Sequence, residues 1–396
     1  MHTTLLITHV RLPDGTPVDI AVDGGRIEEI GPNLQRSADV VRAHGQGALV
    51  LPGFVEGHTH LDKTNWGLPW YRNEVGPRLI DRIENERSWR ASTGHDAGAQ
   101  SLALARAFLA AGTTRLRTHV DIDTDAGLRH LHGVLATRET LADVMDMQVV
   151  AFPQSGMLRR PGTGALLSDA LAAGADVLGA LDPALIDQDP VASLDTTFEI
   201  ANRHQKPVDI HLHEPGEVGA FTFNLLLDRV KALGMQGRVV VSHAFCLGQL
   251  ADRERNVLLA RIADLDVALL TTAPPSVPVP AMRACIEAGV TLFAGNDGIR
   301  DTWTPFGKPD MLERAMFVGM RYDLRREEDL ALAFDCVSTL GAWACGFKDY
   351  GLHEGARADL VLVDAETVAQ AVVSRPVRKL VVARGRIVAR DGVACL

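Results

Sequence analysis

Cysteine is scarce in this sequence, and its placement excludes two kinds of site. The chain of 396 residues has five cysteines, an odd number, and no two of them form a C-x-x-C pair. This pattern excludes a disulfide framework and a cysteine zinc site, and it is typical of reduced thiols. We therefore predict a cytoplasmic protein.

The sequence also lacks the segments that membrane proteins and nucleic-acid-binding proteins need. No apolar run reaches the length of about 18 residues that a membrane span requires, and the start is too short and too polar for a signal peptide. The formal net charge is −10, and no basic run offsets it. With 46% hydrophobic residues, the chain can still bury a large core. We expect a globular protein whose partner is a small molecule, not nucleic acid or a membrane.

Short apolar runs alternate with helical patterns through the middle of the chain, from residue 52 to residue 346. This alternation predicts a (β/α)8 barrel, a TIM-like α/β fold that needs roughly 250 residues. A doubly wound open sheet is the alternative, but no G-x-G-x-x-G motif occurs at a strand-to-helix turn. The predicted strands are one at Val50 and seven at 114–120, 146–152, 177–180, 208–213, 239–243, 267–272 and 291–297. The predicted helices are 96–111, 138–144, 168–173, 194–205, 224–233 and 280–288, with Pro280 in a first helical position.

Both ends of the chain have strand-like patterns separated by turn residues. At the start, the apolar runs 5–12, 19–22 and 26–30 are divided by Pro13-Asp-Gly15 and Asp23-Gly-Gly25. Near the end, runs at 358–364, 377–383 and 387–389 repeat this arrangement. We predict a small β-sandwich domain made from residues 1–51 and 347–396, beside a barrel of residues 52–346.

Histidine and carboxylate side chains end successive predicted strands. His58 and His60 are two residues apart, so on an extended strand their imidazoles share one face and form half of a metal site. A buried structural histidine is the alternative for any single position, but the active site of a barrel lies at these strand ends. The other polar residues at strand ends are His119, Asp121, Gln154, Asp182, His211, His213, Glu214, His243 and Asp297.

Several motifs resemble those of the amidohydrolase superfamily. The segments 54–62, 117–121, 149–154 and 241–243 are similar to those of cytosine deaminases. The strings Asp62-Lys63, His211-Leu-His213, 242–246 and 299–307 more closely resemble the N-isopropylammelide isopropylaminohydrolases of s-triazine breakdown. The resemblance extends from about residue 51 to residue 346, and the strand-rich ends match the split small domain of the superfamily.

The resemblance implies a metal-dependent deaminase or aminohydrolase that removes an amino or alkylamino group from a pyrimidine- or s-triazine-like ring through a metal-activated water. One divalent ion, zinc or alternatively iron or manganese, is expected, and the assembly is expected to be a homo-oligomer. The implied roles are as follows: His58, His60, His211 and Asp297 as metal ligands; His243, Asp297, Glu214 and Lys63 in catalysis; Gln154, His213 and Trp303 in substrate binding.

Two departures from related sequences refine this hypothesis. There is no lysine between Lys63 and Lys206, which removes a bridging carbamylated lysine on a middle strand and predicts one metal, with a bridge through Asp182 as the alternative. After Asp297, Gly298 replaces an aspartate or amide that contacts the substrate in relatives, so a bulkier ring or an N-alkylamino leaving group is expected.

Other interpretations stay open at this stage. The same site could hydrolyse a cyclic amide, or the chain could be a binding relative without activity. We expect His119 to be structural, His130 and His132 to be solvated on a helix, and Trp303 either to line the pocket or to pack in a loop.

Overall fold

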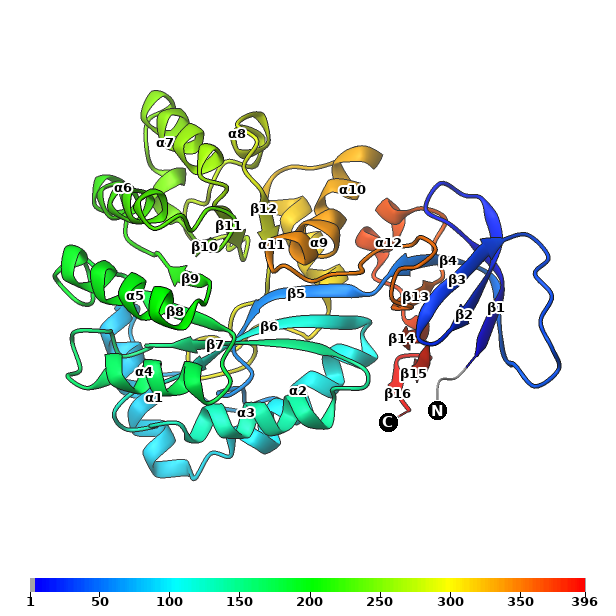
Figure 1. Ribbon diagram of the computed structural model, residues 1–396, viewed down its shortest axis with the longest axis horizontal. Helices are drawn as coiled ribbons and strands as arrows, with labels where there is room; N and C mark the ends of the chain where they lie inside the picture. Colours follow the sequence, from blue (N-terminus) through cyan, green and yellow to red (C-terminus); the bar gives the residue numbers. More distant parts are fainter. Residues whose placement is uncertain (1–3, 396) are drawn as a thin grey trace.

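The computed structural model describes residues 4–395 and contains a nearly closed barrel of eight parallel strands (Figure 1). Strand order follows the sequence, and helices between the strands cover the outside, as the alternating pattern predicted. The first strand was predicted wrongly, because Val50 lies in a strand of the other sheet, Val41–Pro52, and the barrel begins at Phe54. The strands are β5 (Phe54–Thr59), β6 (Thr113–Asp121), β7 (Asp146–Phe152), β8 (Val177–Leu181), β9 (Val208–His211), β10 (Val239–Ser242), β11 (Ala268–Thr271) and β12 (Leu292–Ala294).

The helices of the barrel segment include several that the sequence patterns did not predict. They are α1 (Leu79–Thr93), α2 (Ala97–Ala110), α3 (Arg129–Thr140), α4 (Thr163–Ala172), α5 (Pro190–His204), α6 (Gly216–Ala232), the 3-10 helix η1 (Phe245–Gly248), α7 (Asp252–Asp264), α8 (Met282–Glu287), α9 (Met311–Arg321), α10 (Glu327–Asp335) and α11 (Thr339–Ala344).

Two predicted helices differ from the structure. The segment predicted as 138–144 is the end of α3 followed by a turn. Pro280 is not in a first helical position, because Ala281 keeps an extended backbone with ψ 109° and α8 begins only at Met282. The start of α2 agrees with the predicted helix 96–111, because Asp96 caps it. In contrast, α5 is capped by Asp189 and begins at Pro190, four residues before the predicted start at residue 194.

Both chain ends form a second, eight-stranded sheet in the order β16-β15-β14-β13-β4-β1-β2-β3. Figure 1 shows this sheet beside the barrel. The elements are β1 (Leu5–Arg11), β2 (Pro17–Asp23), β3 (Arg26–Gly31), β4 (Val41–Pro52), β13 (Leu360–Val363), α12 (Val368–Ser374), β14 (Arg378–Ala383), β15 (Arg386–Arg390) and β16 (Val393–Ala394). The fold is therefore the predicted barrel with a separate β unit built from both ends, and the boundaries after residues 51 and 346 stay our proposal.

Alternating side chains join this sheet to the barrel. Val50 and Leu362 belong to a core within the sheet, whereas Leu49, Leu51 and Val361 belong to the core of the barrel. The period of two along a strand explains the division, because successive residues face opposite sides. No helix among residues 4–395 is long and apolar enough to cross a membrane.

A buried carboxylate closes the barrel where β12 meets β5. Only one parallel bridge, between Thr59 and Asp297, joins these segments. The fully buried Glu56 accepts hydrogen bonds from the backbone N–H groups of His58 and Asn296, each at 3.0 Å. Arg314 donates to the Asn296 side chain at 3.0 Å from the other side. Burial raises the pKa of Glu56 to about 7.

We expect Glu56→Ala to lower the free energy of unfolding by about 3 kcal/mol, because two buried N–H groups would lose their acceptor. Denaturant unfolding measures the loss. Glu56→Gln is the matched control: its amide oxygen can still accept a bond, so it should lose clearly less. Equal stability of the two variants would show that Glu56 does not close the barrel.

Candidate active site

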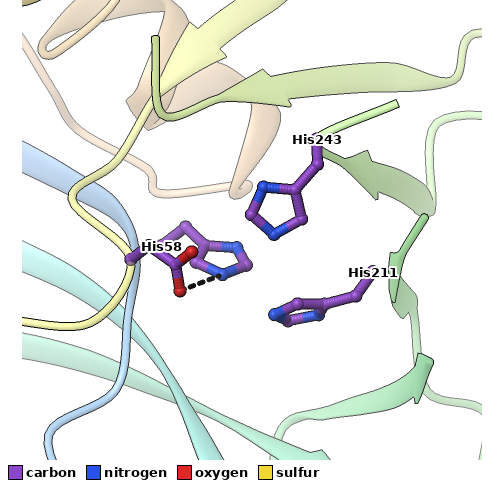
Figure 2. Close-up of side chains that lie close together, drawn as sticks. His58, His211 and His243 are labelled. Carbon is purple, nitrogen blue, oxygen red and sulfur yellow. Dashed lines mark ion pairs between the residues drawn. The ribbon is translucent and has the colours of Figure 1, made fainter. Parts of the chain in front are cut away.

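Four side chains from different strand ends converge inside the barrel (Figure 2). His58 lies on β5, His211 ends β9 and His243 directly follows β10. Asp297 lies three residues beyond Ala294, the last residue of β12. Their nitrogen and carboxylate oxygen atoms lie within 4.8 Å of one another. The three imidazoles are almost completely buried. This is the convergence that the predicted barrel required.

The donor atoms of this cluster fit a metal ion. Within residues 4–395, Nε2 of His58 and both ring nitrogens of His211 and His243 are buried without a hydrogen-bond partner. Buried polar atoms are otherwise nearly always paired, so this group of lone pairs needs a ligand. Histidine and carboxylate together suit zinc and related divalent ions.

His60, a predicted ligand, lies against Asp297 of the cluster. Its Nε2 is 3.2 Å from Oδ1 of Asp297, and the corresponding distance from His58 is 3.8 Å. His60 also groups with His58 and His119 within 4.8 Å, although His119 was expected to be structural. Three of the four predicted ligands thus share one cluster, in which His243 stands beside His58, His211 and Asp297, whereas His60 lies next to this cluster and contacts it through Asp297.

The charge state of the imidazoles favours metal binding. Burial, reinforced by the neighbouring positive groups, lowers the pKa of His60 to about 4 and that of His243 to about 3. It lowers the pKa values of His58 and His211 well below the ordinary value. Neutral imidazole is the form that binds a metal.

The lowered pKa values of these imidazoles predict that the site still binds a metal at acid pH. Protons compete with a metal only below the pKa of a ligand, so we expect metal-free protein to bind zinc almost equally well at pH 7 and pH 5.5. Affinity should fall steeply only below about pH 4, the value to which burial lowers the pKa of His60. Calorimetric titration at a series of pH values measures this. A tenfold loss of affinity between pH 7 and pH 6 would contradict it.

A chain of hydrogen bonds orients His58. Its Nδ1 lies 2.9 Å from Oγ of Ser242, which donates to Asp209 at 2.8 Å. Arg117 donates to the other oxygen of Asp209 at 2.9 Å. Burial raises the pKa of Asp209, but His119 and Arg117 outweigh it and lower the value to about 2. Because Nδ1 is engaged in this way, Nε2 of His58 is left to face the cluster.

His213 and Asp182 form an ion pair at the edge of the cluster. Nδ1 of His213 is 2.7 Å from Asp182, whose second oxygen accepts the backbone N–H of His213 at 2.6 Å. Burial lowers the pKa of His213, but Asp182 outweighs it and raises the value. The ring stacks on His243 with centroids 4.4 Å apart. Asp182 is engaged with His213 and belongs to none of the potential metal clusters of the described residues, which argues against a bridging Asp182.

Glu214 is buried and anchored. Its Oε1 accepts the backbone N–H groups of Ala184 at 2.6 Å and Leu185 at 3.2 Å, and Thr222 donates to Oε2. Burial raises its pKa. The sequence did not indicate these anchors, because they come from the loop after β8 and from α6.

Lys63, predicted to act in catalysis, forms a second group with the predicted substrate-binding residues Gln154 and Trp303. Nζ of Lys63 lies 2.5 Å from the Gln154 oxygen, 3.3 Å from Asp121 and 3.5 Å from Glu86. The Trp303 ring lies 5.4 Å from Nζ, and its N–H donates to Glu86. Burial lowers the pKa of Lys63, but the carboxylates outweigh it and raise the value, so the ammonium stays charged.

The structure differs from the sequence-based expectations at His130 and at Glu86. His130 is not solvated: it is buried, and its Nδ1 lies 2.8 Å from Asp62, in the segment that follows β5. His132, two residues on, is exposed as expected. Glu86, which sequence reasoning missed, lies on α1, where Ile83 is the only other buried residue, so no apolar stripe marked this helix.

Several known proteins are similar to this chain over nearly its whole length. N-isopropylammelide isopropyl amidohydrolase from Pseudomonas sp. (strain ADP) is 32% identical over 98% of each chain. The crystal structure of N-isopropylammelide isopropylaminohydrolase from Burkholderia multivorans is 62% identical, covers 99% of this chain and 100% of its own, and has a TM-score of 0.97. The structure of 5-methylcytosine deaminase from Klebsiella pneumoniae is 26% identical over 99% and 98% of the two chains, with a TM-score of 0.86.

The family assignment rests on nearly the whole chain. Residues 45–389 match the amidohydrolase family. The three relatives are named as hydrolases or deaminases, and the family together with the His/Asp cluster suggests a divalent metal. The chain therefore belongs to the amidohydrolase family of enzymes, as its motifs predicted.

Proposed function

We propose that this enzyme hydrolytically removes an amino or alkylamino group from a pyrimidine- or s-triazine-like ring. The convergence of His58, His211, His243 and Asp297 on one point carries this proposal. It is supported by the 62% identity to N-isopropylammelide isopropylaminohydrolase over the whole chain. An N-alkylamino-triazine is therefore the substrate that we place first.

The proposed metal ligands are His58, His60, His211 and Asp297, with zinc as the first choice and iron or manganese as alternatives. When bound, such an ion lowers the pKa of a water ligand toward about 7 and so supplies a nucleophile near neutral pH. The absence of a lysine between Lys63 and Lys206 supports a single ion.

Two histidines at the cluster, His243 and His213, are suited to accepting or donating protons. His243 is neutral, since burial lowers its pKa to about 3, so its free nitrogen can accept a hydrogen bond and orient water. Its stacking partner His213 is held toward the charged form by Asp182 and can donate a proton to a leaving amine. Glu214 stays our proposal for proton transfer to a ring nitrogen, and burial raises its pKa in the direction that this role needs.

The group formed by Lys63, Gln154 and Trp303 would bind the ring of the substrate. The Lys63 ammonium can donate to an oxo group, and the Gln154 amide beside it can both donate and accept. Trp303 offers an aromatic face next to Lys63. Asp121 and Glu86 keep Lys63 charged, so its role as a donor does not depend on pH near neutrality.

The test is a substrate panel assayed with zinc-loaded enzyme. Ammonia or amine release is measured from N-alkylamino-triazines, amino-triazines, cytosine and 5-methylcytosine. We expect release from at least one triazine, and we expect Glu214→Gln to reduce it strongly. Ring opening without amine release would favour a cyclic amide hydrolase. Protein that is fully loaded with metal but releases no amine from any ring would contradict the proposal. The homo-oligomeric state and cytoplasmic location stay predictions.

A further inference from the structure

A groove between helices α6 and α7 carries large apolar side chains on the outside of the barrel. Helices α5, α6 and α7 follow one another along one side of the barrel (Figure 1). The groove has a volume of about 430 Å³, and Phe221 of α6 and Val257 of α7 both line it. Phe221 is 55% exposed and Val257 is 62% exposed. Exposed apolar side chains that gather in one groove mark an interaction site.

The core of the barrel does not use the apolar side chains of this groove. The buried residues of α6 are Gly219, Thr222, Phe223, Leu226, Leu227 and Val230. Phe221 and the nearby Val218, which is 43% exposed, lie outside this buried stripe. They leave apolar surface in water, and burial of that surface against a partner would be favourable.

Charges of both signs border the groove. Glu217, Arg253 and Glu254 line it, are exposed and take part in no ion pair among residues 4–395. Other charges of these helices are paired, as Arg255 is with Asp252 at 2.9 Å. The groove therefore offers unpaired acidic and basic groups around an apolar centre.

Arg253 lies at an unfavourable position of its own helix. Helix α7 begins at Asp252, so Arg253 is in the first turn, where the helix dipole favours negative charge. Glu217 and Glu254 also lie in first turns, and the dipole alone accounts for them. The arginine is the charge that the helix does not explain, and an acidic group of a partner would stabilise it.

A second copy of the chain offers the complementary charges. In a two-fold interface one surface patch meets itself, so Arg253 of each copy can face Glu217 or Glu254 of the other copy. A partner with charges of a single sign would be repelled by part of this border. The mixture of signs therefore favours a copy of the same chain.

The three helices also supply enough area for such an interface. They have 15, 17 and 13 residues, and α5 is tied to α6 where Arg229 donates to the Val191 carbonyl at 3.2 Å. Helices of this length, packed about 10 Å apart, present a face on the order of 700 Å². A stable interface buries about 800 Å² on each partner, so this face is of the right size class.

We propose that the face formed by α5, α6 and α7 is a two-fold interface between two copies of this chain. Phe221 and Val257 form its apolar centre. At its border, Arg253 of each copy pairs with an acidic residue of the other copy.

Charge reversal is the decisive test, because a second variant can undo it. Arg253→Glu leaves only acidic groups at the border, and Glu217→Lys combined with Glu254→Lys leaves only basic ones. Each variant alone should repel its own copy, so at micromolar concentration its mass by light scattering should be half that of wild type. Mixing the two variants should restore the wild-type mass, with both chains in equal number by native mass spectrometry.

Two further variants test the apolar centre and provide the control. Phe221→Glu should raise the dissociation constant of the interface roughly 30-fold or more, the usual effect of losing a central aromatic anchor. Arg106→Glu should keep the wild-type mass, since Arg106 is exposed on α2 and forms no ion pair among residues 4–395. Circular dichroism should be the same for all variants, because every changed residue is exposed.

A monomeric wild type, an Arg253→Glu protein of wild-type mass, or a mixture that does not reassemble would overturn the proposal. These measurements follow mass and not turnover. A failure of the proposed amine release would therefore leave their result unchanged.

Discussion

Replacing His211 by asparagine should remove both the bound metal and amine release. His211 has two ring nitrogens without partners in the described chain, and it lies within 4.8 Å of three other donors, so its only evident task is coordination. We expect metal content to fall from one ion per chain to nearly none, and amine release to fall on the order of 10³-fold or more, since the activated water is lost.

The metal-free fold should tolerate this substitution. Both ring nitrogens of His211 are buried without a hydrogen-bond partner among residues 4–395, so the metal-free fold gains no hydrogen bond from this ring. Thermal unfolding of metal-free His211→Asn should therefore match that of metal-free wild type within a few degrees. His132→Asn, at an exposed position on α3, is the control and should keep full metal content and activity. A His211→Asn protein with one ion and normal activity would refute the assignment.

Replacing Lys63 by methionine should lower the free energy of unfolding substantially. The substitution leaves Asp121 and Glu86 buried without the ammonium that lies 3.3 and 3.5 Å from them. Breaking a buried ion pair by removing one partner costs about 3–5 kcal/mol. Arg90, 2.9 Å from Asp121, still neutralises part of the charge, so we expect a value at the lower end of this range. Denaturant unfolding measures it.

A double variant separates the structural role of Lys63 from its proposed role in substrate binding. Adding Glu86→Gln to Lys63→Met removes one of the uncompensated charges and should restore about 1–3 kcal/mol of the lost stability. Amine release should stay low, because the donor to the ring is still missing. Recovery of both stability and activity would show that Lys63 only balances charge. Wild-type stability of the single variant would show that the buried ion pairs contribute nothing.

The features that could be predicted from the sequence are those that depend on local periodicity and chain order. Short apolar runs between helical patterns predicted the barrel strands, and the position of His58, His211 and Asp297 at the ends of those runs was enough to bring them together, because parallel strands end at one face of a barrel. The family motifs added the identity of the proposed ligands.

The features that could not be predicted depend on contacts between distant segments. Asp182 pairs with His213 across 31 positions of sequence. Glu86 reaches the pocket from α1, whose polar composition carried no sign of burial. In each case the residue type was visible, but its partner was set by tertiary packing.

The most direct test is a titration of metal-free enzyme with zinc while isopropylamine release from N-isopropylammelide is followed. A single site built from His58, His60, His211 and Asp297 predicts that activity rises linearly and stops at one equivalent of zinc per chain. Activity that keeps rising to two equivalents, or amine release that needs no metal, would contradict a mononuclear aminohydrolase.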